Sequence, residues 1–402
     1  MSAPATARKV LHIGKYFHPH VGGMETYLHD LLRALARLNI TPSALVHQTK
    51  MSITSVEESF SANGSALSVV RVATWCRLLF TPISPGFPWV LHRLIRRDEP
   101  DVLHLHLPNP SAFWALALPS ARRLPWVVHW QSDVLTQRSH WLLKLTYRLY
   151  SPIESAMLKK VDKIIVSSPT YLATSQPLAK VAEKCVVIPL GIDDRFGDQT
   201  QINPALVPFS EGESSTTRDG NLNVLAIGRM THYKGFDILL QAISQAEGVT
   251  LDLVGHGELA RSLERLTDSL NLSTRVRFHG LLDDNARDVL LSRCDCLCLP
   301  STDRTESFGM VLLEAMSAAK ACVVSDVEGS GMSWLVENGE TGLVTPVNDV
   351  DGLTHALCQL RDEPNLATRL GLQGRQKFLT ALNIETSAKA IRDVYHCLLS
   401  PR

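Results

Sequence analysis

The sequence contains no apolar run that approaches the roughly 18 residues of a membrane-spanning helix. Its opening segment, MSAPATARKV, lacks the apolar core of a secretion signal, so we expect a protein of the cytosol. Aromatic residues make up only 6% and charged residues 20% of the 402 residues, beside 45% hydrophobic residues. This balance excludes disordered and fibrous proteins and is typical of a globular enzyme of two domains.

Cysteine is also sparse and scattered. The eight cysteines are spread over a chain large enough to build its own core, so we expect no disulfide framework. Cys294, Cys296 and Cys298 alternate along an expected strand and therefore share one face. Although this spacing resembles a metal cluster, we favour core packing, because small buried thiols pack well.

The formal net charge is zero, so we expect no nucleic-acid partner. The charges nevertheless divide unevenly along the chain. Residues 1–195 hold 22 Lys and Arg against 13 Asp and Glu, whereas residues 196–402 hold 18 against 27. This asymmetry is compatible with one half of the protein facing an anionic surface.

Apolar segments of strand length alternate with longer segments of helical period throughout the chain. This alternation is typical of parallel sheets covered by helices, and it occurs twice, which predicts an α/β fold of two Rossmann-like domains facing each other across a cleft. We expect an N-terminal domain over 1–196, a linker or surface loop over 197–222 and a C-terminal domain over 223–382. The last segment, 383–402, is expected to form a helix that crosses back to the N-terminal domain.

The densest functional signal is PSTDRTESFGMVLLEAMSAAKACVVSD at 300–326. A strand ends there and a helix follows, so the backbone N–H groups from Phe308 to Val311 can bind an anion, most naturally a diphosphate. Glu306 precedes the helix and Glu314 lies inside it. At about 1.5 Å per residue their carboxylates are up to about 12 Å apart, so they can hold two ends of one ligand but cannot share a proton.

Through Glu306-x7-Glu314, with Phe308-Gly309 inside it, the sequence resembles the retaining, nucleotide-sugar-dependent glycosyltransferases of family 4, which have the GT-B fold. The resemblance covers nearly the whole chain. Its other motifs are VGGMETYLHDLL (21–32), HWQSDVL (129–135), VIPLGID (187–193), GRMTHYKGFDILL (228–240), LVGHGEL (253–259) and ENGETGLVTPVND (337–349). The segments HLPNPSAFWALAL and SGMSWLV look more like polysaccharide mannosyltransferases than like sucrose or glycogen enzymes.

This resemblance implies a donor site. Arg229 and Lys234 would neutralise the donor diphosphate in place of a metal, because a leaving nucleoside diphosphate gains negative charge as the glycosidic bond breaks. Glu314 would bind the ribose hydroxyls, and Glu306 would lie beside the transferred sugar. The further donor-binding residues implied by the resemblance are Gly22, Gly23, Leu281, Ser307, Phe308, Gly309, Met310 and Val311.

His129 matches the family's histidine at the donor sugar. It would hydrogen-bond a sugar hydroxyl and place its carbonyl under the anomeric carbon, whereas the alternative is a histidine that caps a strand. Asp133 would touch the acceptor or orient His129. No second carboxylate stands out as a nucleophile, so we favour a front-face reaction in which the departing phosphate accepts the proton of the acceptor.

Three other patterns resemble cofactor sites without their full signatures. Asp349-Val-Asp351 has the spacing of a metal-binding DxD, but it precedes a helix, where an Asp is an N-cap. His104-Leu-His106 has a metal-ligand spacing, and without further ligands we favour packing. The segment VGHGEL at 254–259 lacks a full dinucleotide fingerprint. We therefore expect no metal and no cofactor apart from the nucleotide-sugar donor.

Residues 137–160 and 78–97 mix aromatic and aliphatic side chains with Arg and Lys. Both segments suit helices that lie on a membrane surface with cations toward lipid phosphates, and both equally suit core helices with a solvated basic face. The uneven charge of the two halves favours peripheral attachment to the inner face of the cytoplasmic membrane.

We therefore predict a retaining, metal-independent hexosyltransferase. It would move mannose from GDP-mannose onto a lipid-linked saccharide in exopolysaccharide, O-antigen lipopolysaccharide or capsule biosynthesis. A donor such as UDP-glucose or UDP-N-acetylglucosamine is the main alternative. A sugar-nucleotide epimerase on the same fold and a non-catalytic sugar- or lipid-binding protein are two further alternatives, and the sequence leaves the acceptor, linkage and oligomeric state open.

Overall fold

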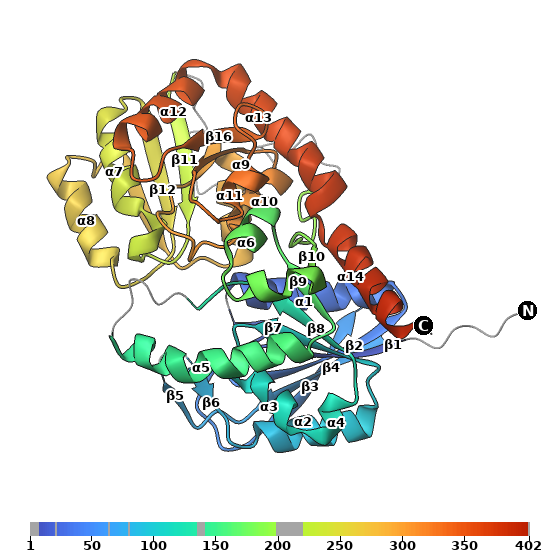
Figure 1. Cartoon of the computed structure of the whole chain (residues 1–402). Coiled ribbons are helices and arrows are strands. Elements are labelled where there is room, and N and C mark those ends of the chain that lie inside the picture. Colours follow the sequence, from blue (N-terminus) through green and yellow to red (C-terminus); the bar gives the residue numbers. More distant parts are fainter. Residues whose placement is uncertain are drawn as a thin grey trace, which may run out of the picture. The chain divides into compact units, whose positions relative to one another are not determined.

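The protein is described by a computed structural model that covers residues 8–20, 22–62, 65–78, 81–134, 141–197 and 220–400. The chain divides into two compact units (Figure 1). The N-terminal unit comprises Met1–Asp193 and Ile384–Arg402, and the C-terminal unit comprises Asp194–Asn383. The chain thus changes unit close to the expected boundaries after residues 196 and 382, while most of the expected linker lies outside the described residues.

The N-terminal unit is built on an eight-stranded sheet of order β10-β9-β8-β7-β1-β2-β4-β3. Every neighbouring pair is parallel except β3 and β4 at one edge. The strands are β1 (Arg8–Ile13), β2 (Ile40–His47), β3 (Val56–Ala62), β4 (Ser65–Val72), β7 (Val102–Leu107), β8 (Trp126–Trp130), β9 (Lys163–Val166) and β10 (Cys185–Val187). A separate hairpin pairs β5 (Cys76–Leu78) with β6 (Thr81–Ile83).

Helices cover both faces of this sheet (Figure 1). Near the start of the chain, apolar residues at helical spacing form one face of α1, whose Leu28, Leu31 and Leu35 are buried. Helix α14 packs beside α1, and Tyr27 Oη lies 3.2 Å from Ser387 Oγ. The helices are α1 (Gly23–Arg37), α2 (Phe87–Asp98), η1 (Pro110–Phe113), α3 (Trp114–Ala117), α4 (Pro119–Arg122), α5 (Trp141–Lys160), α6 (Pro169–Thr174), η2 (Leu178–Lys184) and α14 (Ile384–Leu399).

The C-terminal unit is built on a six-stranded, fully parallel sheet of order β13-β12-β11-β14-β15-β16. The strands are β11 (Leu222–Ile227), β12 (Val249–Val254), β13 (Val276–Gly280), β14 (Cys296–Leu299), β15 (Ala321–Ser325) and β16 (Gly342–Thr345). This is the strand order of a Rossmann fold. The order reverses between β11 and β14, and ligands of such sheets bind at the carboxyl ends of the strands at that point.

Figure 1 shows α7 and α12 on one side of this sheet and α9 and α10 on the other. Cys294, Cys296 and Cys298 are free and buried, with Cys296 and Cys298 in the apolar core. The helices are η4 (His232–Lys234), α7 (Phe236–Gln245), α8 (Ala260–Ser269), α9 (Asp284–Arg293), α10 (Met310–Ser317), α11 (Met332–Leu335), α12 (Val350–Asp362), α13 (Pro364–Lys377) and η5 (Phe378–Leu382). Within the described part of the chain, no helix is long and apolar enough to cross a membrane.

Candidate active site

The loops that follow β11 and β14 meet at the reversal point of the C-terminal sheet. The backbone N–H of Thr302 donates to the carbonyl of Tyr233 at 2.7 Å, which holds the two loops together. Lys234 from the first loop then forms an ion pair with Glu306 from the second, with 2.5 Å between Nζ and Oε2. Two residues expected at the donor site, 72 positions apart, are therefore in direct contact.

The Lys234–Glu306 pair is largely shielded from water. The side chain of Lys234 is 9% exposed and that of Glu306 is 13% exposed. Burial disfavours the ammonium form of Lys234, but the Glu306 carboxylate outweighs burial and raises the pKa of Lys234. Lys234 therefore carries a fixed positive charge at the end of the sheet where ligands of this fold bind.

Glycines allow this close packing. Gly235 has φ +65°, and a Cβ atom there would lie 2.1 Å from the carbonyl oxygen of Pro300. At residue 228 a Cβ atom would lie 2.9 Å from Cε of Lys234. Side chains at Gly228 and Gly235 would thus push Lys234 and the two loops apart, so the glycines of the motif GRMTHYKG have a structural reason here.

Helix α10 presents its amino end beside the ion pair. Gly309 precedes the helix with φ 84°, and no side chain of the described residues caps it. Hydrogen bonds from the segment after β15 hold the main chain of Glu306 and Ser307. Ser330 Oγ donates to the Glu306 carbonyl at 2.5 Å, and the Gly331 N–H donates to the Ser307 carbonyl at 2.8 Å. The Leu312 N–H donates to the Gly309 carbonyl at 2.8 Å, whereas Met310 and Val311 open the helix, where N–H groups have no acceptor one turn earlier. This helix end can therefore bind an anion.

The side chain of Phe308, which directly precedes Gly309, is buried. Only the main chain of Phe308 can therefore face a ligand, as was expected for the amides of this segment. Leu281, expected near the nucleotide base, is exposed just after β13.

Glu314 lies among arginines that sequence reasoning did not find. Its Oε2 atom is 3.3 Å from Nε of Arg287, and its Oε1 atom is 3.6 Å from Nη2 of Arg195. Burial raises the pKa of Glu314, and the two arginines oppose that rise. Arg195 also donates to Asp288 at 3.2 Å. No motif marks Arg195 or Arg287, because only the fold brings α9 and the segment after VIPLGID to Glu314.

Arg229 does not join the Lys234–Glu306 pair. Its side chain is 58% exposed and lies 3.4 Å from Glu258. Arg229 and Lys234 thus occupy the same loop in different environments, one solvated and one buried. Their joint action on a diphosphate stays a prediction.

In the N-terminal unit, the carboxyl ends of β1, β7 and β8 surround a small polar hollow. Gly22 caps α1 beside it, and a Cβ atom on Gly22 would lie 2.3 Å from Glu25 Oε2. Gly23 is the first residue of the helix. The hollow is lined by Gly14, Lys15, Tyr16, Met24, Glu25, Leu28, His106, Pro108 and Gln131.

His129 lies in β8 with its imidazole fully buried, so it does not simply cap the end of a strand. Neither ring nitrogen has a hydrogen-bond partner among the described residues. Asp133 Oδ1 instead accepts hydrogen bonds from Trp130 Nε1 at 2.9 Å and Ser175 Oγ at 2.7 Å. The described residues show no hydrogen bond between Asp133 and the His129 ring, and both roles expected of Asp133, at the acceptor or in orienting His129, stay predictions.

The DxD-like pattern has a structural explanation. Asp349 is the N-cap of α12, and its carboxylate accepts a hydrogen bond from the Gly352 N–H at 2.9 Å. The predicted capping role is confirmed.

Comparison with known proteins agrees with this geometry. The two sheets of the chain are parallel apart from β3 at one edge, and the second has Rossmann strand order with a cationic helix end at its reversal point, which is the architecture of the GT-B fold. Residues 21–196 match the model "Glycosyltransferase Family 4", and residues 211–377 match "Glycosyl transferases group 1". The chain belongs to family 4 of the glycosyltransferases.

Its relatives include bacterial enzymes of similar length. The chain is 29% identical to O-antigen chain mannosyltransferase C of Escherichia coli, over 98% of this chain and 100% of the relative. It is 33% identical to lipopolysaccharide core biosynthesis glycosyltransferase LpsE of Rhizobium meliloti, over 95% of this chain and 96% of that relative. It is 31% identical to D-rhamnosyltransferase WbpZ of Pseudomonas aeruginosa, over 73% of this chain and 74% of that relative.

Solved structures show the same fold. Sucrose-phosphate synthase from Thermosynechococcus elongatus superposes with a TM-score of 0.78 at 22% identity, over 97% of this chain and 99% of that one. WaaG, a glycosyltransferase involved in lipopolysaccharide biosynthesis, superposes with a TM-score of 0.69 at 16% identity, over 96% of this chain and 99% of that one.

Proposed function

We propose that this glycosyltransferase is a retaining, metal-independent hexosyltransferase of cell-surface polysaccharide biosynthesis. It transfers mannose from GDP-mannose to a lipid-linked saccharide, in the assembly of exopolysaccharide, O-antigen or capsule. The full-length similarity to an O-antigen chain mannosyltransferase supports mannose and this class of acceptor. The similarity to enzymes of lipopolysaccharide core biosynthesis supports the same pathway class.

The observation that carries the proposal is the buried Lys234 beside the amino end of α10. Bond cleavage between the sugar and the diphosphate leaves negative charge on the departing phosphate. The fixed ammonium and the first-turn N–H groups of α10 stabilise that charge more strongly in the transition state than in the bound substrate. A protein cation and helix amides thereby perform the role that a metal has in other transferases. The phosphate, as it departs, is the base that accepts the proton of the acceptor hydroxyl.

The remaining donor contacts are proposed on the family resemblance. Arg229 would approach the diphosphate from the solvated side of its loop, and Glu314 would bind the ribose. In the structure Glu314 is already held between two arginines, so its carboxylate is positioned before any ligand binds. The roles of Gly22, Gly23, Leu281 and His129 stay predictions on the same ground.

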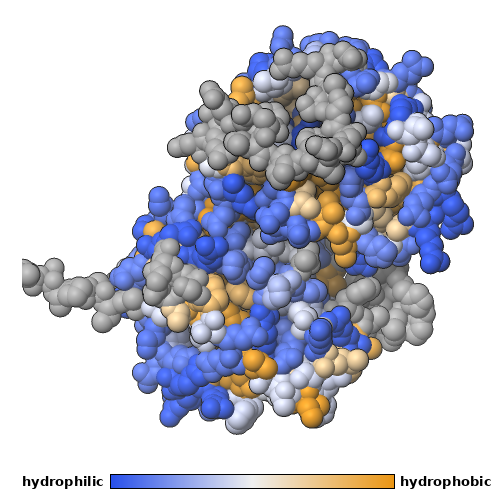
Figure 2. All heavy atoms as spheres, turned by 180° about the vertical axis from the view of Figure 1, so that it is seen from behind, coloured by the Kyte–Doolittle hydropathy of each residue, from blue (hydrophilic) through white to orange (hydrophobic). Residues whose placement is uncertain are grey.

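Attachment to the inner membrane surface is part of the proposal. Trp75, Trp89 and Trp114, all in the N-terminal unit, are 61%, 65% and 45% exposed. Arg93 lies over the Trp89 ring, with 5.8 Å from Cζ to the ring centroid. Figure 2 shows apolar side chains reaching the surface in spots surrounded by hydrophilic ones. Exposed Trp beside Arg is the combination that suits a membrane interface.

Part of the segment expected to bind membrane is not described. Residues 137–140 lie outside the described residues. In the described half of α5, Leu149 and Ile153 are exposed.

The donor is tested by thermal denaturation of the purified protein with GDP, UDP and ADP at equal concentration. We expect GDP to raise the unfolding midpoint most, and the variant Lys234→Met to lose most of that shift. A larger shift with UDP would replace GDP-mannose by a UDP-sugar donor. If no nucleotide changed the midpoint, the protein would be a binding protein and not a transferase.

Transfer itself is tested with GDP-mannose and a lipid-linked acceptor extract. We expect acceptor-dependent release of GDP and an axial anomeric linkage in the product, as retention of α-mannose requires. Conversion of the donor without acceptor would indicate an epimerase instead.

A further inference from the structure

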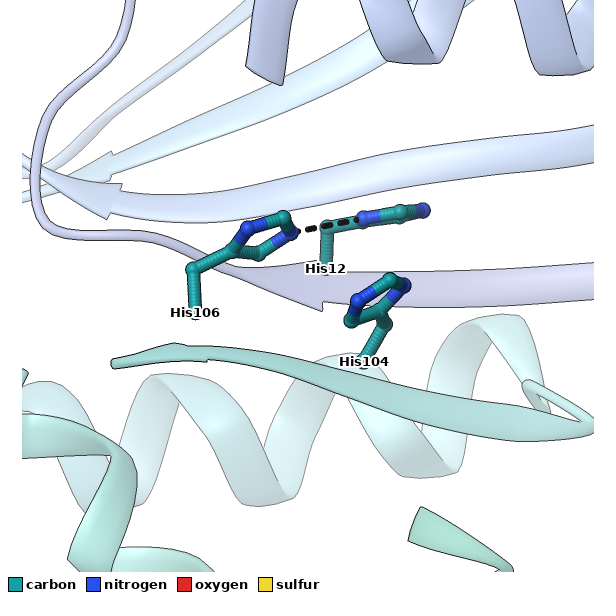
Figure 3. Close-up of side chains that lie close together, drawn as sticks. All are labelled: His12, His104 and His106. Atoms are coloured by element: carbon teal, nitrogen blue, oxygen red, sulfur yellow. Dashed lines mark hydrogen bonds between the residues drawn. The ribbon is translucent and has the colours of Figure 1, made fainter. Parts of the chain in front are cut away.

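One cluster of buried ionisable side chains, in the N-terminal unit, is explained by packing. His12 from β1 and His104 and His106 from β7 lie together inside the fold (Figure 3). The rings of His104 and His106 stack with 4.6 Å between their centroids, and His12 Nδ1 and His106 Nε2 form a hydrogen bond of 3.1 Å. The histidines thus contact one another, in line with the packing expected of His104 and His106.

A second cluster, in the C-terminal unit, is a network of ion pairs. Glu314 of α10 lies between two arginines, with 3.3 Å from Oε2 to Arg287 Nε and 3.6 Å from Oε1 to Arg195 Nη2. Each arginine also pairs with a carboxylate of α9, Arg287 with Asp284 at 3.0 Å and Arg195 with Asp288 at 3.2 Å. We call these five residues the Glu314 network.

The centre of the Glu314 network is shielded from water. The side chains of Glu314 and Arg287 are 12% and 14% exposed. Glu314 Oε2 and Arg287 Nε are both enclosed, and neither takes part in a hydrogen bond among the described residues. Because a buried charge is costly without an opposite charge nearby, the 3.3 Å approach of these two atoms is what compensates both of them.

Arg287 also decides which oxygen of Glu314 a ligand can meet. It lies against the enclosed Oε2 atom, so in this arrangement a ligand reaches the carboxylate through Oε1. Glu314 follows Met310, the first residue of α10, by four residues, or about 6 Å along the helix. Helical side chains lean toward the amino end of their helix, which here is the end proposed to bind the diphosphate. One nucleotide can therefore meet both groups.

The charges of the network favour hydroxyl groups over phosphate at Glu314. Three carboxylates face two guanidinium groups, which leaves a net charge of −1 when all five side chains are ionised. Burial raises the pKa of Glu314, and Arg287 and then Arg195 oppose that rise. An ionised carboxylate only accepts hydrogen bonds, so it binds hydroxyl donors and repels a phosphate. Lys234, at the other end of the proposed donor site, has the opposite charge and the opposite preference.

We propose that Arg287 and Arg195 are positioning residues of the donor site, which hold the Glu314 carboxylate with one oxygen turned to the ribose hydroxyls of the nucleotide. The assignment rests on the proposed function, in which Glu314 binds the ribose, and adds the two residues that make Glu314 able to do so. Arg287 is the more important of the two, because it contacts the enclosed oxygen at the shorter distance. Neither arginine contacts the nucleotide in this role.

The test measures binding of GDP and of 2′,3′-dideoxy-GDP, which lacks both ribose hydroxyls, to the purified full-length protein by calorimetry. Wild type should bind GDP at least about tenfold more tightly, because hydrogen bonds to a charged acceptor are strong. In Arg287→Met this preference should fall below about threefold, while the affinity for 2′,3′-dideoxy-GDP should change by less than about threefold. A merely structural loss would weaken the binding of both nucleotides equally. Arg287→Lys keeps the positive charge and should restore part of the preference.

The matched control is Arg275→Met. Arg275 is a half-buried arginine of the same unit, and its guanidinium donates to the Ala246 and Val249 carbonyls at 2.7 and 3.4 Å. These carbonyls lie at the amino end of β12, so Arg275 lies at the edge of the sheet opposite to the proposed donor site. This variant should keep the wild-type preference for GDP.

A wild-type preference below about twofold would overturn the proposal, and so would an unchanged preference in Arg287→Met. If Arg287→Met does not fold, Arg195→Met is measured in its place and must lose at least about half of the preference. If UDP binds and GDP does not, UDP and 2′,3′-dideoxy-UDP form the pair. Binding of neither nucleotide would contradict the proposed function and this inference with it, whereas tight binding without a preference for ribose contradicts only this inference.

Discussion

Removing one member of the Lys234–Glu306 pair should destabilise the C-terminal unit more than removing both. The two charges are 2.5 Å apart and mostly buried. Each single variant, Lys234→Met or Glu306→Gln, therefore leaves the remaining side chain shielded from water and without its ion-pair partner. Breaking a buried ion pair in this way costs about 3–5 kcal/mol. Lys234→Met should lie at the upper end, because it leaves a carboxylate uncompensated. The double variant leaves no unpaired charge and should cost only about 1–2 kcal/mol.

The assay is a double-mutant cycle by urea denaturation, which isolates the coupling between the two side chains. We expect a coupling free energy of at least about 2 kcal/mol. Because a two-unit protein need not unfold in one step, hydrogen exchange of peptides from β11 and β14 should locate the change in the C-terminal unit. Additive single effects, with coupling below about 0.5 kcal/mol, would refute the ion pair.

The same variants separate binding from turnover. A charge-assisted hydrogen bond contributes about 1.5–3 kcal/mol, so Lys234→Met should weaken nucleoside diphosphate binding roughly 10- to 150-fold in calorimetry. Glu306→Gln removes a negative charge from the site and should bind the diphosphate at least as tightly as wild type. Turnover should nevertheless fall at least about tenfold in both variants, or roughly 1.4 kcal/mol of barrier. Unchanged turnover would remove them from the active site.

Three further predictions concern packing, ionisation and surface. Gly235→Ala should lower the free energy of unfolding by at least about 2 kcal/mol, measured by thermal denaturation, because its Cβ atom would lie 2.1 Å from the Pro300 oxygen. The control Gly339→Ala, at φ +76° in open space, should lower it by about 1 kcal/mol, and equal losses for the two variants would contradict the prediction. Burial raises the pKa of Glu154 to about 7, above its unfolded value, so stability is lost as pH rises from about 4.5 through 7. Glu154→Gln should therefore gain about 1–2 kcal/mol relative to wild type between pH 5 and pH 8, after allowance for solvent screening, and a constant difference would exclude this ionisation. Trp89→Ser should reduce sedimentation with anionic liposomes several-fold without changing GDP binding, and unchanged sedimentation would remove Trp89 from the membrane contact.

Periodicity and motif order predicted much of the fold. Leu28, Leu31 and Leu35 stand at helical spacing and form the buried face of α1, and the apolar runs at 102–107 and 126–130 form β7 and β8. These features are local, because a few neighbouring residues determine which face is buried.

Contacts between distant segments could not be predicted in the same way. His12 reaches His106 across 94 positions, and only the pairing of β1 with β7 shows it. Lys234 and Glu306 were assigned to one site by resemblance, but their direct ion pair depends on how closely two glycine-containing loops approach. Arg287 carries no motif, and its contact with Glu314 depends on the fold placing α9 and α10 on the same side of the C-terminal sheet (Figure 1).

The central claim is that the amino end of α10 and Lys234 bind the diphosphate of an activated sugar. A crystal structure with bound GDP tests it most directly. We expect phosphate oxygens within hydrogen-bond distance of Lys234 Nζ and of the Met310 and Val311 amides. A nucleotide bound elsewhere, with Lys234 still paired only to Glu306, would contradict the account.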